Sequence, residues 1–375
     1  MKKKLFLIVN EDRFFLSHRK PLAVRALEEG FDVTVIAKDT GRSGDVRSLG
    51  VKYVNPPVNP TGTNLLQEFK TFVFFMRLFR KERPDVVHNV GLKMMLWGGL
   101  AARFRRVPVV ISAVSGLGVM FSDGKMSIYA KAVLSALKFS NRRREAYSIF
   151  QNNEDKALFL SHGVVKEEQC VFIKGSGVDL AEYAYAPEPE GGNIVVLFTG
   201  RMVAEKGVLV LAQAAELLRS EYRDKVEFRL CGGLHSNPLA LKEPEIRALC
   251  DDTYIKWLGH RDDIREQLIN SHIVAFPSYY GEGLPKSLIE ASAIGRPIVT
   301  CDSVGCRDAV KDGVNGFLVP AKDPVALASR LRMLIDDRGL RVRMGLNSRK
   351  FAERDYSIDN VVDIHMSLYR RSLNV

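Results

Sequence analysis

Two glutamates stand eight positions apart in the stretch GEGLPKSLIEASAIGRPIVT, which covers residues 281–300. Pro285 lies between Glu282 and Glu290 and suits the first position of a helix, where its missing N–H costs nothing, and Gly295 is a typical helix end. Glu282 is therefore predicted in the loop before the helix, and Glu290 about one and a half turns inside it. Two hydrogen-bond acceptors beside a helix N-terminus, which favours anions, suit a ligand with hydroxyls at two places and a phosphate between them. A nucleotide-sugar has this outline.

Two cations flank another loop of the second half, in TGRMVAEKGVLVLAQAAELL (residues 199–218). Arg201 and Lys206 follow an apolar run and precede a long apolar helix pattern, so both are predicted on a strand-to-helix loop. The free N–H groups and positive dipole of the helix N-terminus add to their charge, which indicates a diphosphate site. Taken alone, these residues fit solvated surface cations equally well, and Glu282 and Glu290 fit ordinary helix charges.

The elements that must position these residues form a repeating pattern of short apolar strands and helices. Continuous apolar runs of this kind are typical of buried parallel strands, and four occur in each half of the chain: residues 4–9, 32–37, 85–90 and 107–112, then 193–200, 226–233, 272–278 and 296–302. Helical patterns lie between them. We therefore predict an α/β protein with two Rossmann-like, doubly wound domains. Ligands of such folds bind beyond the carboxyl ends of the strands, so two facing domains imply a cleft lined by those loops.

The length of 375 residues and the hydrophobic share of 46% agree with two domains that each have a core. Residues 181–192 contain two prolines and two glycines near their end and form the natural linker. The predicted organisation is a first domain over residues 1–180, this linker, a second domain over residues 193–355, and a C-terminal helix over residues 356–375 that returns to the first domain.

Four motifs of the second half occur in an order that resembles a known family: GRMVAEKG (residues 200–207), LGHRDDI (258–264), EGLPKSLIEASAIGRPIV (282–299) and DGVNGFLV (312–319). They resemble the retaining GT-B glycosyltransferases of family 4. In the first half NEDRFFLSHRKPLA (10–23), GLK (91–93) and SGLG (115–118) resemble the subgroup that builds bacterial surface glycans on a polyprenyl-diphosphate carrier. The resemblance covers nearly the whole chain and is sharper in the second half.

The resemblance implies a role for each matching position of the second half. Arg201 and Lys206 would neutralise the donor diphosphate as it leaves, which stabilises charge that develops in the transition state. Glu282, with the backbone of Gly283 and Leu284, would hold the hydroxyls of the transferred sugar.

Two further positions would hold the nucleoside of the donor. Glu290 would accept both ribose hydroxyls, and the loop around Arg261 would border the base. The motif that contains Asp312 and Gly316 is expected to shape a turn. The second domain would thus bind the nucleotide-sugar, with UDP as the family-level expectation for the nucleotide, and the first domain would face the acceptor and the membrane.

The chemistry implied by the resemblance is that of a retaining hexosyltransferase. No D-x-D triplet occurs in the sequence, so no obvious carboxylate pair is offered to a nucleotide-bound Mg²⁺ or Mn²⁺, and we expect no metal and no other cofactor. Retention would follow from attack on the face from which the diphosphate departs. A covalent glycosyl-enzyme would need a carboxylate nucleophile, and Glu282 leaves that alternative open.

The acceptor side is less well defined. Many family members place a histidine in the stretch that here reads SAVSGLG (residues 112–118), which has none. The candidates for acceptor contacts are His18 and Arg19, which follow the first strand, together with Lys93 and Ser115. His88 lies on an apolar strand end, where a histidine is more often structural than catalytic.

The positive charge is unevenly distributed. Residues 1–187 hold 29 Lys plus Arg against 18 Asp plus Glu, and residues 188–375 hold 26 of each, so the formal net charge of +11 lies in the first half. The run FKTFVFFMRLFRKER (residues 69–83) would form an apolar helix with a basic end, suited to packing on the sheet or lying at a lipid interface. Lys125, Lys131, Lys138 and Arg142–Arg144 extend the basic surface. An anionic inner-leaflet partner is expected, and no helix-turn-helix or aromatic RNA platform suggests nucleic acid.

The cysteine usage and the lengths of the apolar runs indicate the cellular compartment of the protein. The five cysteines form no CxxC pair and have no histidine at zinc-ligand spacing, which predicts buried thiols in a reducing cytosol rather than disulfides or a metal site. Lys2–Lys4 are followed by a short apolar run that is far too short for a signal-peptide core, and no run of 18 apolar residues occurs. A cytoplasmic protein that attaches peripherally to the inner face of the membrane is expected.

The resulting hypothesis is a glycosyltransferase that moves an N-acetylhexosamine or hexose from a nucleotide-diphosphate sugar to a polyprenyl-diphosphate-linked saccharide. The first alternative is another GT-B enzyme, a nucleotide-sugar 2-epimerase or a soluble glycan synthase. The second is a non-catalytic module that binds a sugar nucleotide or a glycan.

Overall fold

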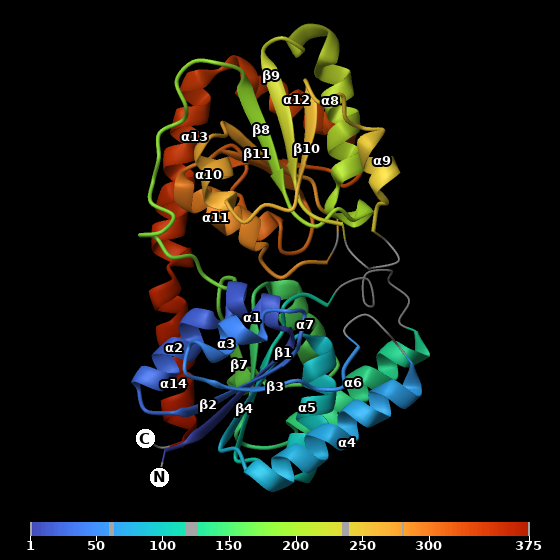
Figure 1. The fold of residues 1–375 in the computed structure, drawn as a ribbon, viewed down its shortest axis with the longest axis vertical. Helices are drawn as coiled ribbons and strands as arrows, with labels where there is room; N and C mark the ends of the chain where they lie inside the picture. The colour runs from blue at the N-terminus through green and yellow to red at the C-terminus, as the bar shows by residue number, and fades with distance from the viewer. Residues whose placement is uncertain (1, 60–63, 118–126, 235–239, 280, 374–375) are drawn as a thin grey trace. The chain divides into compact units, whose positions relative to one another are not determined.

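The computed structural model describes residues 2–59, 64–117, 127–234, 240–279 and 281–373 (Figure 1). Gly118 of the SGLG motif and Lys125 of the basic surface lie outside the described residues. The chain divides into two compact units, unit 1 (Met1–Ser176 with Ile358–Val375) and unit 2 (Gly177–Ser357). Each unit is a layered α/β structure with a parallel sheet, so the predicted fold class is confirmed.

The sheet of unit 1 has seven parallel strands in the order β3-β2-β1-β4-β5-β6-β7. The reversal of direction at β1 puts the switch point of a doubly wound sheet between β1 and β4. The strands are β1 (Lys4–Glu11), β2 (Asp32–Lys38), β3 (Lys52–Val54), β4 (Val86–Val90), β5 (Val109–Ala113), β6 (Ala146–Phe150) and β7 (Cys170–Phe172).

Both faces of this sheet are covered because its central strands are apolar on both sides. In β1, Leu5, Leu7 and Val9 pack in one core, and Phe6 and Ile8 pack in another on the opposite face. The first core contains α1 (Asp12–His18), α2 (Lys20–Glu28), α3 (Ser43–Arg47) and the C-terminal α14 (Ile358–Leu373); the helices of the other side are α4 (Leu65–Glu82), α5 (Leu92–Phe104), α6 (Ile128–Asn141) and α7 (Asn153–Ser161). The C-terminal helix thus belongs to the core of unit 1.

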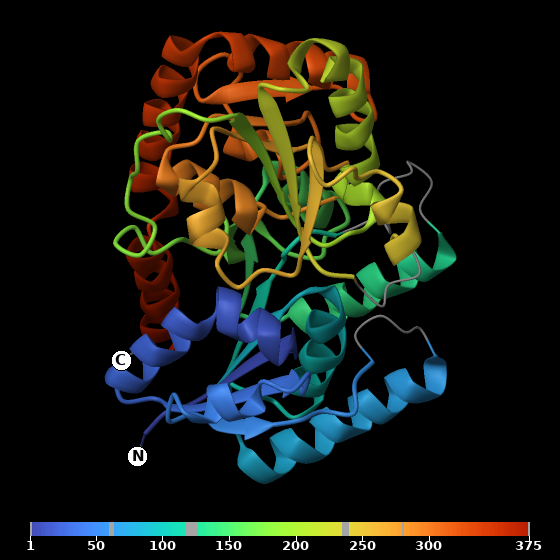
Figure 2. The same ribbon diagram turned by 45° about the horizontal axis from the view of Figure 1, so that its top comes forward.

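The sheet of unit 2 has six parallel strands in the order β10-β9-β8-β11-β12-β13. Its strands are β8 (Ile194–Thr199), β9 (Val226–Cys231), β10 (Ile255–Gly259), β11 (Ile273–Phe276), β12 (Ile298–Cys301) and β13 (Gly316–Val319). Its helices are α8 (Val208–Tyr222), α9 (Glu243–Arg247), α10 (Ile264–Ile269), α11 (Lys286–Ile294), α12 (Pro324–Asp336) and α13 (Arg338–Phe351). Helix α8 packs on α12, and α11 packs on α10 and α13, so the two groups cover the sheet (Figure 2).

The structure refines two sequence-based expectations. Pro285 is the N-cap of α11 rather than its first helical residue, whereas Gly295 ends the helix in the left-handed conformation as predicted, with φ of 87°. Residues 181–192, expected to be a linker, lie inside unit 2, because hydrogen bonds and ion pairs fasten them to its helices. Among the described residues, no helix is both long and apolar enough to cross a bilayer.

The structure also shows the state of the cysteines and the turn predicted around Asp312. All five cysteines are free thiols, of which Cys231, Cys301 and Cys306 are buried and Cys170 and Cys250 partly so. Asp312 accepts a hydrogen bond from the Leu318 amide at 2.9 Å, so its side chain closes a turn before β13, as expected.

Candidate active site

The loop between β8 and α8 carries both predicted diphosphate-binding cations. Arg201 is exposed two residues after the end of β8, and Lys206 closes a short 3₁₀ turn (Ala204–Lys206) and is 8% exposed. Gly207 follows with φ of 83°, and a Cβ there would lie 2.1 Å from the carbonyl oxygen of Pro277. Only glycine permits this close approach of the loop to the chain after β11, which brings Lys206 towards the glutamate loop.

Lys206 and Glu282 form an ion pair in this structure. Their side chains are 10% and 13% exposed, and the Lys206 ammonium also lies 5.2 Å from the centre of the Phe276 ring. Ser278 donates its hydroxyl to the same Glu282 oxygen at 3.2 Å. The pair therefore holds the cation and the carboxylate together in a partly dehydrated setting, where each is electrostatically strong.

The loop of Glu282, Gly283 and Leu284 packs against a second loop, which contains Gly305. A Cβ at Gly305, which has φ of 81°, would lie 1.6 Å from the carbonyl oxygen of Gly283 and 2.6 Å from that of Glu282. Gly283 is buried and Leu284 is 6% exposed, so the loop before α11 is packed against the chain around Gly305.

Glu290 opens onto a pocket of about 250 Å³ at the carboxyl ends of β8, β9 and β10. Arg201 and Arg261 line the same pocket, so three predicted donor-binding residues are brought together. The remaining lining residues are Thr199, Gly200, Cys231, Gly232, Gly233, His260, Ile264 and Ser287. Its polar groups converge at the strand ends of a doubly wound sheet, which is where ligands of such folds typically bind.

The carboxylate of Glu290 is deeply buried, and its surroundings act in opposite directions on its pKa. Burial, the largest cause, raises the pKa of Glu290, while Lys286 at 3.4 Å and the Tyr183 hydroxyl lower it. Neither partner was predicted from the sequence. Lys286 carried an available signal, since it stands four residues before Glu290 on the same helix, whereas Tyr183 lies more than 100 residues away.

Arg261 is held by its neighbour Asp263, whose carboxylate accepts from the Arg261 Nε at 2.7 Å. This pair lowers the pKa of Asp263 to about 2, because the guanidinium stabilises the charged carboxylate. His260 and Gly233 line the pocket beside Arg261 and were not predicted individually. The signal for both was present, since each lies within two residues of the carboxyl end of a strand of the parallel sheet.

The four acceptor candidates of unit 1 have separate local surroundings. Arg19 is 3% exposed, and its Nε has no hydrogen-bond partner. Burial lowers the pKa of Arg19 to about 10, and the nearby buried groups are Tyr369 and the neutral imidazoles of His88 and His365. His88 is buried and contacts the Tyr369 hydroxyl at 2.6 Å, which fits its interpretation as a structural histidine.

The other three candidates lie nearer the surface. His18 stacks on Phe14 with ring centres 4.2 Å apart and contacts Ser17. Lys93 is paired with Glu68 at 2.7 Å, and its side chain is 19% exposed. Ser115 is partly buried and lies just beyond the carboxyl end of β5. Gly91, just beyond the end of β4, lies between Ser115 and Asn10 of β1. Of the four, Ser115 thus has the position typical of a ligand-binding loop in a parallel sheet.

Comparisons with known families match both halves of the chain. Residues 193–337 match the family described as glycosyl transferases group 1, and residues 4–144 match the family described as glycosyl transferase 4-like. The first match covers all six strands of unit 2 and the candidate site, and the second covers β1 to β5 of unit 1.

Similar proteins extend over nearly the whole chain. N,N'-diacetylbacillosaminyl-diphospho-undecaprenol alpha-1,3-N-acetylgalactosaminyltransferase of Campylobacter jejuni is 27% identical over 95% of this chain and 98% of its own length. UDP-Gal:alpha-D-GlcNAc-diphosphoundecaprenol alpha-1,3-galactosyltransferase of Escherichia coli is 26% identical over 91% of this chain and 89% of its own. The capsular polysaccharide biosynthesis glycosyltransferase CapM of Staphylococcus aureus is 26% identical over 82% of each chain.

Solved structures agree on the fold. Anabaena Alr3699/HepE in complex with UDP and glucose superposes with a TM-score of 0.77 at 18% identity, over 98% of this chain and 100% of that one. A glycosyltransferase from Rickettsia africae gives a TM-score of 0.75 at 17% identity, over 99% of each chain. With two parallel doubly wound sheets and family matches in both halves, the chain belongs to the group 1, family 4-like glycosyltransferases of the GT-B fold.

Proposed function

We propose that the chain transfers an N-acetylhexosamine or a hexose from a UDP-linked donor to a polyprenyl-diphosphate-linked saccharide, with retention of configuration and without a metal. The observation that carries the proposal is the pocket in which Arg201, Arg261 and Glu290 converge, together with the neighbouring Lys206–Glu282 pair. These groups supply a positive site for a diphosphate and acceptors for the hydroxyls on either side of it.

The acceptor class is supported by the similar proteins. The Campylobacter and Escherichia relatives are named for transfer to undecaprenol-diphosphate-linked saccharides, and the Staphylococcus relative for capsular polysaccharide biosynthesis. We extend that acceptor class, and a role in bacterial surface-glycan synthesis, to this chain. The same names favour transfer over the epimerase and soluble-synthase alternatives.

The ion pair suggests how donor binding prepares the reaction. In this structure Lys206 neutralises Glu282, and a bound diphosphate would compete for the ammonium. When Lys206 turns to the diphosphate, Glu282 becomes available to accept hydroxyls of the transferred sugar. Arg201 and Lys206 then stabilise the negative charge that grows on the leaving diphosphate. The departing diphosphate takes the acceptor proton, so attack occurs on its own face and the configuration is retained.

We propose that these side chains replace a divalent cation. Two cationic side chains next to the N-terminus of α8 provide the charge that Mg²⁺ supplies elsewhere. Turnover should accordingly be unchanged by EDTA, and restoration of lost turnover by added Mg²⁺ or Mn²⁺ would contradict this part of the proposal.

A lipid-linked acceptor fits the surface of unit 1 formed by α4, α5 and α6, which lie side by side (Figure 1). Most phenylalanines of α4 are packed inward, but among the side chains that the structure describes on these helices, six large apolar ones are exposed: Leu66, Phe69, Phe104, Ile128, Tyr129 and Phe139. Exposed cations lie among them, such as Lys70, Lys131 and Lys138. We propose that this apolar and basic face attaches the protein to an anionic inner leaflet, where each basic residue contributes about 1 kcal/mol.

Sedimentation with vesicles tests the membrane face. Replacement of Leu66 and Phe69 by serine should reduce binding to vesicles that contain phosphatidylglycerol several-fold. The matched control replaces Leu217 and Val325, which are exposed on unit 2, and should bind normally. Equal binding by both double variants would refute the assignment of this face.

The donor site is tested by thermal unfolding in the presence of UDP, GDP, ADP or dTDP, each with and without EDTA. A ligand that binds only the folded state raises the melting temperature. UDP alone should give an EDTA-resistant increase that is lost in Glu290→Ala. A shift with a nucleotide other than UDP would mean that the donor carries a different base. The absence of a shift with all four nucleotides would support the non-catalytic alternative. Sugar release or epimerised donor in reactions without acceptor would reveal the epimerase alternative.

A further inference from the structure

Two loops form one wall of the proposed donor pocket. Gly200 follows β8 and Gly232 follows β9, and a Cβ at Gly232 would lie 1.7 Å from the carbonyl oxygen of Gly200. The Gly200 amide donates to the Cys231 carbonyl at 2.9 Å. Glycine at position 232 thus allows the loops to come together, because it has no Cβ. We call Gly200, Gly232 and Gly233, which all line the pocket, the glycine wall.

The pairing of β9 with β10 becomes irregular beside the glycine wall. Trp257 pairs with Leu230, but the next pair is Gly259 with Cys231, so β10 has one residue more than β9 at this point. The Gly232 amide still donates to the Gly259 carbonyl at 2.8 Å. Irregularities of this kind are frequent beside active sites, where they end the pairing of two strands. The Gly232 carbonyl therefore lies beyond the last pair of the ladder.

A side chain of β10 supplies a donor for this carbonyl. The indole N–H of Trp257 donates to the Gly232 carbonyl at 2.8 Å. The Trp257 ring is partly buried and packs against the core of unit 2, and the Arg247 guanidinium lies 5.5 Å from its centre. Packing of this kind fixes the direction of the N–H, which a buried tryptophan usually uses for one hydrogen bond. Trp257 thus fastens the glycine wall to β10 where the backbone ladder ends.

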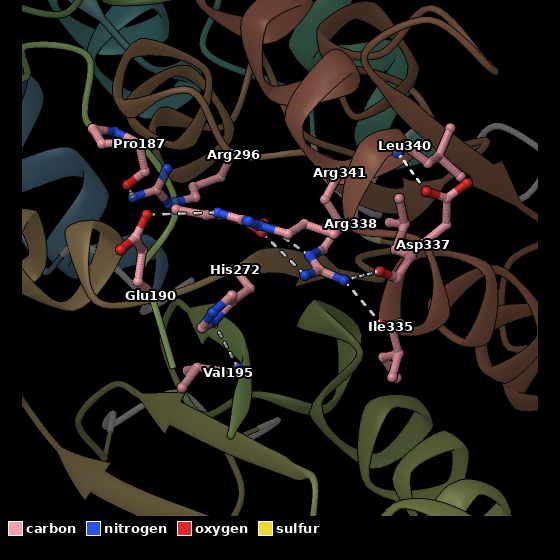
Figure 3. Close-up of polar contacts among 12 residues, drawn as sticks. Pro187, Glu190, Val195, His272, Arg296, Ile335, Asp337, Arg338, Leu340 and Arg341 are labelled. Atoms are coloured by element: carbon pink, nitrogen blue, oxygen red, sulfur yellow. Dashed lines mark hydrogen bonds and ion pairs between the residues drawn. The ribbon is translucent and has the colours of Figure 1, made fainter. Parts of the chain in front are cut away.

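Other side chains hold the backbone of unit 2 away from the pocket. His272 accepts from the Val195 amide at 3.0 Å, and Arg341 donates to the Ile335 carbonyl at 3.0 Å (Figure 3). None of these four residues lines the pocket. The bond from Trp257 differs from these bonds because its acceptor belongs to a residue that lines the pocket.

We propose that Trp257 is a positioning residue of the donor pocket: its indole N–H, by holding the Gly232 carbonyl, keeps the glycine wall in the shape that accepts the nucleotide. The inference rests on the proposed role of this pocket in nucleotide binding. Consecutive glycines such as Gly232 and Gly233 have many accessible backbone conformations. A bond that selects one of them before the ligand arrives lowers the entropic cost of binding.

Titration calorimetry of the full chain with UDP tests this inference. Trp257→Phe keeps an aromatic ring but removes the N–H, and it should weaken UDP binding roughly three- to tenfold, the effect of one lost hydrogen bond. Tyr254→Phe is the matched control, because the Tyr254 hydroxyl donates to the Ala215 carbonyl at 2.9 Å in the same unit, and neither residue lines the pocket. It should bind UDP as the wild type does. Unaltered binding by Trp257→Phe would overturn the proposal, as would an equal loss in Tyr254→Phe.

An isosteric replacement separates the hydrogen bond from the volume of the ring. The chain has two tryptophans, so Trp97→Phe leaves Trp257 as the only one. In that background tryptophan is replaced biosynthetically by its benzothienyl analogue, which has sulfur in place of the N–H. The analogue should weaken UDP binding as much as Trp257→Phe does. Unchanged affinity with the analogue would show that packing alone matters, and would overturn the proposal.

Steady-state kinetics separate positioning of the nucleotide from damage to the chemical step. A contact that holds the nucleotide equally in the ground state and the transition state changes KM and leaves kcat unaltered. Trp257→Phe should therefore raise KM for the UDP-sugar roughly three- to tenfold and keep kcat within about twofold of the wild type. A fall in kcat with an unchanged KM would contradict the proposed positioning role.

Glu290→Ala separates the inference from the function on which it rests. If the wild type does not bind UDP, or if Glu290→Ala binds UDP as tightly as the wild type, the proposed role of the pocket is refuted, and the inference with it. If Glu290→Ala binds weakly and Trp257→Phe binds normally, only the positioning role of Trp257 is refuted. Both variants should bind UDP more weakly than the wild type.

Discussion

Replacing Lys206 by methionine should affect stability and turnover through two separable causes. The substitution keeps an unbranched side chain of similar length in contact with Phe276 but removes the charge that Glu282 faces. A partly dehydrated carboxylate would remain without its ion-pair partner. Lys206 would also no longer be present to meet the diphosphate of the donor.

The stability effect follows from burial. Two unit charges at about 4 Å attract by roughly 4 kcal/mol at an effective dielectric constant near 20. The side chains of Lys206 and Glu282 are only 10% and 13% exposed, so little solvent screening remains, but Ser278 still donates to the carboxylate. A net loss of about 2 kcal/mol is expected, which corresponds to a fall of roughly 4–8 °C in the melting temperature of a unit of this size.

The catalytic effect is expected to be larger. Removal of one preorganised group that stabilises developing charge typically lowers kcat by about 100- to 1000-fold. The double variant Lys206→Met/Glu282→Gln removes both charges, so it should recover much of the lost stability but none of the turnover. This difference distinguishes a chemical role from damage to the fold.

The assay combines thermal unfolding of the full chain with turnover of a UDP-sugar and a lipid-linked acceptor. Lys256→Met is the matched control, because Lys256 pairs with Glu227 at 2.9 Å in the same unit and Arg229 remains to neutralise that glutamate. It should retain wild-type turnover. Wild-type turnover in Lys206→Met would refute the electrostatic role, and a double variant as unstable as the single one would refute the energetic coupling of the pair.

Three further outcomes are expected. Arg201→Ala should lower turnover by a similar factor without changing the melting temperature, because Arg201 is exposed; equal loss of stability would contradict this assignment. Gly305→Ala should abolish UDP-dependent stabilisation, since its Cβ would collide with the carbonyl of Gly283. At Gly313 a Cβ would meet open space, so Gly313→Ala should cost only about 1 kcal/mol of stability from left-handed backbone strain. Burial lowers the folded-state pKa of His365 to about 3, so stability should be full above the unfolded value near 6.5 and fall as the pH decreases from there towards 3. The difference in the free energy of unfolding between pH 7 and pH 5, measured by urea unfolding, should be smaller in His365→Leu than in the wild type.

Much of the fold was predictable because its central strands are buried on both faces. Eight continuous apolar runs correspond to β1, β2, β4, β5, β8, β9, β11 and β12. The strands that were not predicted are shorter or lie towards the sheet edges, where apolar runs weaken: β3, β6, β7, β10 and β13. Lys52–Val54, for example, has only three residues and none of them is fully buried. Such strands form because a neighbour supplies the hydrogen-bond ladder, which local sequence does not reveal.

The candidate site was predictable where it depends on a loop between a strand and the next helix. Arg201 and Glu290 fall at one pocket because the carboxyl ends of parallel strands share one edge of the sheet. The ion pair between Lys206 and Glu282 was not predicted, since it requires the close packing of Gly207 on Pro277. Arg19 was expected at the acceptor site from its place after β1, but the return of α14 buries it beside Tyr369.

The sequence by itself determined the residue types that a nucleotide-sugar needs and the order in which strands and helices present them, because those are properties of local pattern. Tertiary structure alone decided which distant groups complete the site. Lys206 reaches Glu282, for example, only because Gly207 lets its loop pack closely on Pro277. Apolar periodicity carries no information about such contacts, since they arise from the specific packing of side chains that are far apart along the chain.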